Sequence, residues 1–131
     1  MTQFARWLAV PAVFAGWLVA AAMASAATPG VKDNARPAFF KPETVEKANQ
    51  VIREIHDNYG KELVIETFTS VPQSDHDRVT RMAREDREKY FSEWANRLAR
   101  EQRVNGIFVL ICRSPGHVEV AVDRETEKKD F

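Results

Sequence analysis

The apolar run Ile107–Cys112, with the sequence IFVLIC, constrains the fold more than any other segment of this chain. A short apolar run bounded by turn residues predicts a strand that is covered on both faces. The turn sequence Arg-Ser-Pro-Gly follows, and His117–Asp123 then alternates, with Val118, Val120 and Val122 on one side. We therefore predict a central strand that leads through a tight turn into an antiparallel strand, solvated on its other face.

A proline and a glycine bracket an apolar stripe and predict the first helix. Pro42 suits a first helical turn, and Gly60 suits the residue after the last one. Between them, apolar side chains recur at three- and four-residue spacing: Val45, Ala48, Ile52, Ile55 and Tyr59. This spacing is typical of an amphipathic helix with these side chains on its buried face.

A second strand and a second helix are expected between this helix and the IFVLIC run. Glu62–Thr69 is β-branched and mostly apolar, which predicts a strand. Asp77–Arg103 predicts one long helix, bent or exposed at the wholly charged stretch Arg84–Lys89 and stopped by Asn105-Gly106. Because a helix joins the two strands, they should be parallel.

The expected fold class is therefore α/β, a three-layer α/β/α sandwich with a small mixed sheet. The last residues, Arg124–Phe131, predict a C-terminal helix that is truncated. Residues 42–131 form this domain, and residues 28–41 form an extended, proline-punctuated lead-in to it. Residues 1–27 have a weakly basic start, a long uncharged run and small residues at the end, as in a secretory signal peptide. An uncleaved signal anchor is the alternative, because the run is long enough to span a bilayer.

Charge and cysteine content narrow the class of protein. The chain has 19 basic and 19 acidic side chains, so no long-range field attracts nucleic acid and no such partner is expected. Cys112 is the single cysteine, so no disulfide within the chain supports the fold. We expect an exported protein, periplasmic or otherwise extracytoplasmic or membrane-anchored, whose partner is an unknown envelope protein or membrane complex.

The sequence CRSPGH raises the question of a thiol active site. A phosphate-binding cysteine loop of the tyrosine-phosphatase type separates its Cys and Arg by five residues, whereas Arg113 follows Cys112 directly. Pro115 also removes one backbone N–H from the loop. We interpret Cys112 as a small buried hydrophobe. His117, which begins the next strand, is expected to be an ordinary surface histidine.

The segment Ser74–Asp77 groups a hydroxyl, an imidazole and two carboxylates. Our main interpretation is that Ser74 or Asp75 caps the following helix. The alternative is that Asp75 and Asp77 ligate Ca²⁺ or another divalent cation. Ligands of open α/β sheets bind beyond the carboxyl ends of parallel strands, and Asp33 joins this region if the lead-in folds over that edge.

Two motifs give a resemblance to a known family. Val31–Ala35 reads V-x-D-x-A, and Asn105-Gly106 precedes the apolar strand. With the order of elements, this resembles the TPM domain, the family of the thylakoid-lumen acid phosphatase, the photosystem II repair protein and the levamisole-receptor modulator. The resemblance implies an α/β/α sandwich exposed outside the cytoplasm, with phosphatase activity and divalent-cation binding in some members.

The resemblance also implies candidate site residues. Its matching positions are Asp33, Asn105 and Gly106. Together with the residue chemistry above, it makes Asp33, Asp75 and Asp77 candidate metal ligands and makes Arg113 and Asn105 candidate substrate-binding residues. The family domain continues through a further helix, without which one face of the sheet is expected to be partly bare.

Two functions follow as expectations. The first is an exported TPM-domain protein that acts as a binding or assembly module of the cell envelope. The alternative is a divalent-metal-assisted acid phosphatase, which needs Asp33, Asp75 and Arg113 to converge. A binding module should instead show an exposed apolar patch. We expect that patch around Tyr90, Phe91 and Trp94.

Overall fold

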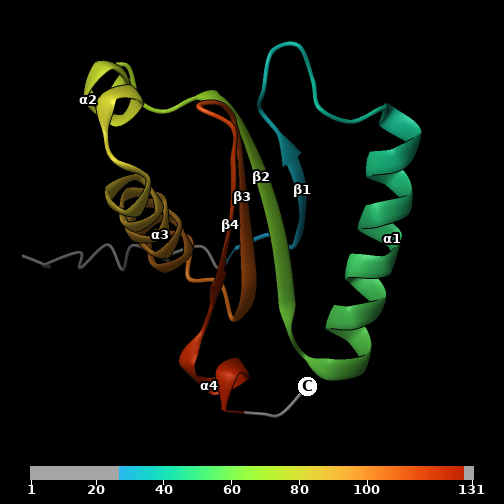
Figure 1. Cartoon of the computed structure of the whole chain (residues 1–131). Coiled ribbons are helices and arrows are strands. Elements are labelled where there is room, and N and C mark those ends of the chain that lie inside the picture. The colour runs from blue at the N-terminus through green and yellow to red at the C-terminus, as the bar shows by residue number, and fades with distance from the viewer. Residues whose placement is uncertain (1–26, 129–131) are drawn as a thin grey trace, which may run out of the picture.

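The structure is a computed structural model that describes residues 27–128; residues 1–26 and 129–131, which include nearly all of the predicted signal segment, lie outside the described part. The elements are β1 (Gly30–Asp33), α1 (Pro42–Tyr59), β2 (Glu62–Ser70), α2 (His76–Arg81), α3 (Arg84–Glu101), β3 (Gly106–Ser114), β4 (His117–Val122) and α4 (Arg124–Glu127). The sheet has the order β1-β2-β3-β4; α1 covers one face, and α2 and α3 cover the other (Figure 1). This confirms the predicted α/β fold class.

The pairing of the strands follows the sequence-based expectation. β2 and β3 are parallel, and β3 and β4 are antiparallel. β1 adds a third parallel strand beside β2 and comes from the lead-in, which the sequence predicted only as extended. Among residues 27–128, no helix is long and apolar enough to cross a membrane.

The main core lies between the sheet and the helices α2 and α3. Large side chains from both layers are fully buried there, including Val64, Phe108 and Leu110 from the strands and Val79 and Phe91 from the helices. Burying a side chain of this size contributes about 1.5–3 kcal/mol. This core therefore holds α2 and α3 firmly against β2, β3 and β4.

α1 begins at Pro42 and ends at Gly60, as predicted, but it packs more loosely. Gly60 adopts the left-handed conformation, with φ 63°, and its N–H donates to the His56 carbonyl at 2.8 Å. Of the predicted buried stripe only Ile52 is fully buried, and Tyr59 is 69 % exposed. The prediction for Tyr59 is wrong because α1 packs mainly over β1 and β2.

The predicted single helix Asp77–Arg103 is also wrong, because Met82 and Ala83 interrupt it. Both adopt extended backbone angles, with ψ 147° at Met82 and 157° at Ala83. A straight helix of that length would be about 40 Å long, more than the sheet can cover. The break lets α2 and α3 each bury apolar side chains, and Arg87 bridges it by donating to the Met82 carbonyl at 3.1 Å.

Gly106 permits the close approach of β2 and β3 at the start of their pairing. It has φ 154°, and a Cβ there would lie 2.1 Å from the Glu62 carbonyl oxygen. Glu62 is its register partner in the parallel pair. No other residue type fits this position without displacing the backbone of β2.

We predict that Gly106→Ala lowers the free energy of unfolding by at least about 2 kcal/mol, because the new methyl group collides with backbone atoms. The matched control is Gly116→Ala, whose Cβ would lie 3.7 Å from the nearest atom and which should stay within about 1 kcal/mol of wild type. Urea unfolding followed by tryptophan fluorescence measures both. Equal effects of the two substitutions would contradict this role of Gly106.

Candidate functional site

Asp33 lies at the carboxyl end of β1, where it ties the β1–α1 loop to β2. Its carboxylate accepts hydrogen bonds from the Thr67 hydroxyl at 2.6 Å and from the Phe40 N–H at 2.9 Å. Thr67 in turn accepts from the Ala35 N–H at 3.1 Å, and Thr69 accepts from the Arg36 N–H at 2.7 Å. The lead-in thus does fold over this edge, but both oxygens of Asp33 are occupied in holding it there.

These contacts set the acidity of Asp33. Burial acts to raise the pKa of its carboxyl, but hydrogen bonds from Thr67 and from the N–H groups of Phe40, Phe39 and Ala35 outweigh burial and lower it. The carboxylate is therefore stabilised in its charged form by the loop that it organises.

Asp75 is held by different partners, on the α3 side. It stands at the N-cap position, directly before α2, but its side chain makes no capping hydrogen bond, so the predicted capping role of Asp75 is wrong. The carboxylate instead accepts from Arg78 at 3.1 Å and from the Tyr90 hydroxyl at 2.9 Å. Its pKa is lowered by the hydrogen bonds from Arg78 and Tyr90, while burial and the hydrogen bond to Asp75 raise the pKa of Tyr90 to about 12.

The structure does not bring the three candidate metal ligands together. Asp33 faces a groove against α1, Asp75 bonds to α3 on the other side of the sheet, and the Asp77 side chain is 90 % exposed. No cluster of three or more His, Cys, Asp or Glu side chains suited to a metal is present between residues 27 and 128. The metal site stays a prediction without a supporting geometry.

The two candidate substrate-binding residues lie at opposite ends of β3. The Arg113 guanidinium stacks over the Phe39 ring, with its central carbon 4.4 Å from the ring centre. Its buried Nη1 has no hydrogen-bond partner in the described part of the chain. Asn105 precedes β3, where its N–H donates to Glu62 at 2.7 Å and its side chain accepts from Lys61 at 3.1 Å. They therefore do not share a site.

Cys112 is a core residue, as predicted. It is 3 % exposed, burial raises the pKa of its thiol, and the thiol donates to the Ser114 carbonyl at 3.6 Å. His117 was predicted wrongly, because its ring stacks on Phe91 at 4.1 Å and contacts the Glu119 carboxylate at 2.9 Å. Successive side chains of a strand point to opposite faces, so His117 and Glu119, two residues apart in β4, lie on the same face. This spacing was the sequence signal for their contact.

The exposed apolar patch lies elsewhere than predicted. Phe91 and Trp94 are buried and Tyr90 is partly buried, so the expectation of a patch there is wrong. The outward valines of β4 form the patch instead. Val118 is 61 % exposed, Val120 53 % and Val122 39 %.

The strand register places these valines on the α1 side of the sheet. Ile65 lines a small cavity together with Val45 and Ala48 of α1, so it faces that helix. Ile65 pairs with Val109, which pairs with Val120. The α1-facing side of β3 and β4 is therefore a continuous apolar surface, and β4 leaves it open. From the sequence, we expected the other face of β4 to be the solvated one. That prediction is wrong, because His117, Glu119 and Ala121 lie on the face that packs against α3 and the valines are the exposed side chains.

α1 adds a second apolar wall to this surface. The Val31 N–H of β1 donates to the Asn49 side chain at 2.8 Å, so Asn49 marks the flank of α1 that faces β1. Around the helix axis, Asn49 lies about 60° from Ile52 in one direction. Ile55 and Val51 lie about 60° and about 100° from Ile52 in the other direction. They thus face β3 and β4, and Val51 is 54 % exposed. We call this apolar angle between α1 and the β3–β4 surface the docking corner.

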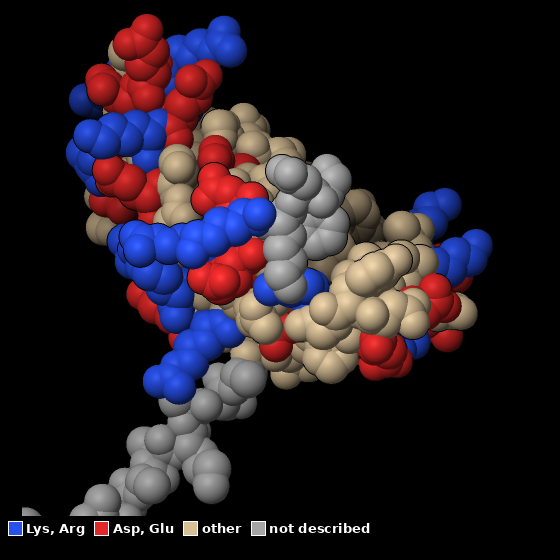
Figure 2. Space-filling view, turned by 90° about the horizontal axis from the view of Figure 1, so that it is seen from below, with Lys and Arg blue, Asp and Glu red and all other residues tan. Residues whose placement is uncertain are grey.

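The docking corner deepens at the end that lies nearest to α4. A pocket of about 390 Å³ lies between α1 and the start of β3 and is lined by Ile55, Tyr59, Lys61, Glu62, Leu63, Ile107 and Thr126. Seen from the α4 end, acidic and basic side chains are interspersed over the α3 side, whereas uncharged atoms cover much of the α1 side (Figure 2). The recess is therefore mostly apolar, with Lys61 and Glu62 as its charged lining residues, on a surface of mixed charge.

No family model, curated protein or solved structure matches this chain. The resemblance to the TPM domain therefore stays a prediction, and the site has to be interpreted from its own geometry.

We predict that Asp33→Asn lowers the free energy of unfolding by about 1–3 kcal/mol at pH 7, because a loop N–H or the Thr67 hydroxyl loses its acceptor. The folded-state pKa of Asp33 lies below its unfolded value of 3.8. The stabilisation is therefore complete above pH 3.8 and is lost as the pH falls through the folded-state pKa. Urea unfolding at several pH values measures the difference from wild type. Asp57→Asn, at an exposed position of α1, is the control, and a wild-type advantage over Asp33→Asn that persists unchanged at pH 2 would contradict the assignment.

Proposed function

We propose that this chain is a protein-interaction module that docks one amphipathic α-helix of a partner protein in the docking corner. The observation that carries the proposal is the row of exposed valines on β4, which continues the apolar surface of β3. Contiguous exposed apolar surface of this kind typically marks an interaction site.

The geometry of the corner favours a helix over other occupants. Neighbouring strands lie about 4.8 Å apart, so the β3–β4 surface is about 10 Å wide, which is the diameter of a helix with its side chains. α1 fills the equivalent place over β1 and β2. A partner helix lying beside α1 would complete the third layer of the sandwich and would contact Val51 and Ile55 with its flank.

The partner's chemistry follows from the walls of the corner. Six residues of β4 span about 20 Å, which matches roughly 13 residues of helix. The occupant needs apolar side chains at i, i+3, i+4 and i+7 on the face that meets the valines. Its outer face would be polar, as the outer face of α1 is.

Export is the second part of the proposal. It is supported by the sequence of residues 1–27, with a basic start, an uncharged run and small residues before position 28. The partner would then be an envelope protein. The alternative of a metal-assisted phosphatase gains no supporting observation, since Asp33 and Asp75 lie on opposite sides of the sheet.

Binding to a model helix tests the docking corner. The probe is a labelled 18-residue amphipathic peptide with leucines at helical spacing, and fluorescence anisotropy measures its affinity. We expect Val120→Lys to weaken binding at least about tenfold, because the ammonium group would be buried against the peptide. Gln50→Lys, on the outer face of α1, adds the same charge away from the corner and should bind as wild type does.

Three outcomes would contradict the docking proposal. They are no saturable binding by the wild type, equal binding of a peptide with the same composition but scrambled spacing, or an equal loss in both lysine variants. Concentration-dependent self-association that buries the valines would assign the face to a second copy. Binding to neutral lipid vesicles that is lost in Val120→Lys, without peptide binding, would assign it to a membrane surface.

The export proposal has its own test. Expressed with its full N-terminus in a bacterial host, the protein should appear in the envelope fraction, beginning at Ala27 or Thr28 by N-terminal sequencing. A full-length product in the membrane would support the anchor, and a full-length product in the cytoplasm would contradict export.

A further inference from the structure

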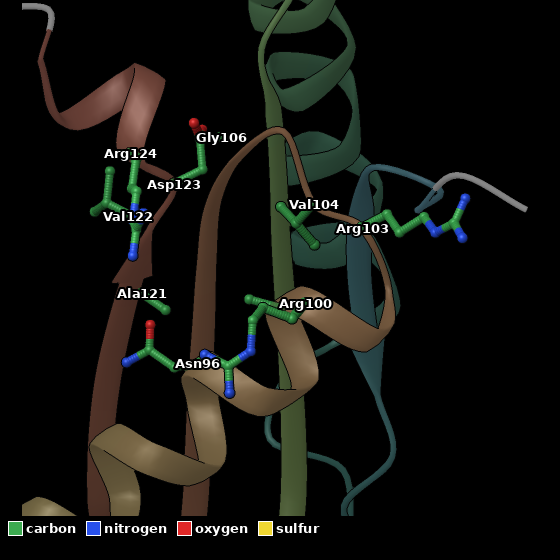
Figure 3. Close-up of a pocket in the computed structure, with 10 residues that line it drawn as sticks. Asn96, Arg100, Arg103, Val104, Gly106, Ala121, Val122, Asp123 and Arg124 are labelled. Carbon is green, nitrogen blue, oxygen red and sulfur yellow. The ribbon is translucent and has the colours of Figure 1, made fainter. Parts of the chain in front are cut away.

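A second recess lies on the face of the sheet opposite the docking corner. It is a cleft of about 420 Å³ between the C-terminal half of α3, the start of α4, the start of β3 and the end of β4 (Figure 3). A cavity of this size is within the range of small-molecule sites. Of its lining residues, only Val122 also belongs to the row of exposed valines used in the proposed function above.

Three polar side chains converge on this cleft. Asn96 and Arg100 lie four residues apart on α3, so they share one face of that helix. Arg124 reaches toward them from α4 across the cleft, whereas the Arg103 side chain points away from it (Figure 3). Two guanidinium groups and an amide therefore surround the same space.

In the described part of the chain, no neighbouring group neutralises the positive charge of this cleft. Within residues 27–128, the side chains of Arg100 and Arg124 take part in no hydrogen bond or ion pair, unlike Arg84, which pairs with Glu88 at 2.9 Å. The one acidic side chain in the lining, Asp123, is already engaged. It accepts hydrogen bonds from the Thr126 hydroxyl and from the N–H groups of α4, and Lys61 lies 4.0 Å from it.

The remaining lining is small and apolar. Ala99, Val104, Gly106, Ala121 and Val122 form it. Gly106 and Ala121 are buried, so the floor is a fixed part of the sheet. A bare inorganic ion would satisfy the arginines but would leave most of this volume and its apolar floor unused.

We propose that this cleft binds a small organic anion that carries at least two acidic groups on a short hydrocarbon body. Planar guanidinium groups pair in a bidentate way with carboxylates and phosphates alike. Arg100 and Arg124 hold the acidic groups from opposite walls, and the alanines contact the hydrocarbon part. Asn96, whose amide nitrogen donates to the Ser92 carbonyl at 2.8 Å, forms a polar part of the wall beside Arg100. Polycarboxylates and phosphate esters share this chemistry.

Calorimetric titration of the full chain distinguishes a polycarboxylate ligand from a phosphate ester. The probes are citrate, as a tricarboxylate, and glycerol 3-phosphate, as a phosphate ester, with acetate as a monovalent control at matched ionic strength. We expect saturable binding of at least one polyvalent probe and none of acetate. Arg100→Gln and Arg124→Gln should each weaken it at least tenfold, whereas Arg103→Gln, whose side chain points away, should bind as wild type does.

Circular dichroism melts of the same variants show whether each is folded. Loss of binding in all three glutamine variants would mean that general surface charge, not the cleft, attracts the anion, and the proposal would fail. It would also fail if neither polyvalent probe bound to the wild type. Val120→Lys, on the opposite face, should bind the anion unchanged, so this test and the test of the docking corner fail separately.

Discussion

The parallel pairing of β2 with β3 is the interaction on which the rest of the structure depends. The two strands match residue for residue from Glu62 and Gly106 onward, and Gly106 lets their backbones meet at that end. Parallel strands of this composition need an apolar cover on both faces. α2 and α3 provide a full cover on one face, while α1 covers only half of the other. The other half is left exposed at the β4 valines, and this is the surface that we propose binds a partner.

The polar groups at the carboxyl edge of the sheet have a structural role. That edge is where ligands of open α/β sheets bind, and the sequence placed Asp33 there. In the structure the lead-in folds across the edge, and Asp33, Thr67 and Thr69 hold its backbone. The two proposed recognition surfaces lie instead on the two faces of the sheet: an apolar corner beside α1 and a basic cleft beside α3.

Local patterns predicted the elements well and the packing between them less well. Pro42 and Gly60 defined α1 because they act on the backbone near them. The burial of Tyr59 was predicted wrongly because it depends on how much sheet lies under α1, which is a property of the whole fold. The break at Met82 likewise follows from the width of the sheet. The exposed patch was expected around Tyr90, Phe91 and Trp94, but Phe91 and Trp94 are buried against the sheet.

The residues of the two proposed sites were likewise only partly predictable from the sequence. The exposed valines were visible as an alternating pattern, but only the register shows that they extend the surface beside α1. Arg100 and Arg124 lie far apart in the sequence, and no motif joins them. The helical spacing of Asn96 and Arg100 was a signal for one wall of the cleft, whereas the other wall comes from α4, a single turn that the sequence showed only as an unfinished helix.

Carbene footprinting of the full chain, read by mass spectrometry, tests the central claim most directly. The account predicts heavy labelling of Val118, Val120 and Val122 in the isolated protein, at the level of exposed side chains, and none at Val64 or Val79 in the core. Adding the amphipathic peptide should protect the three β4 valines together with Val51. If these valines are as protected as Val64 in the isolated monomer, the face is already covered and the docking corner does not exist.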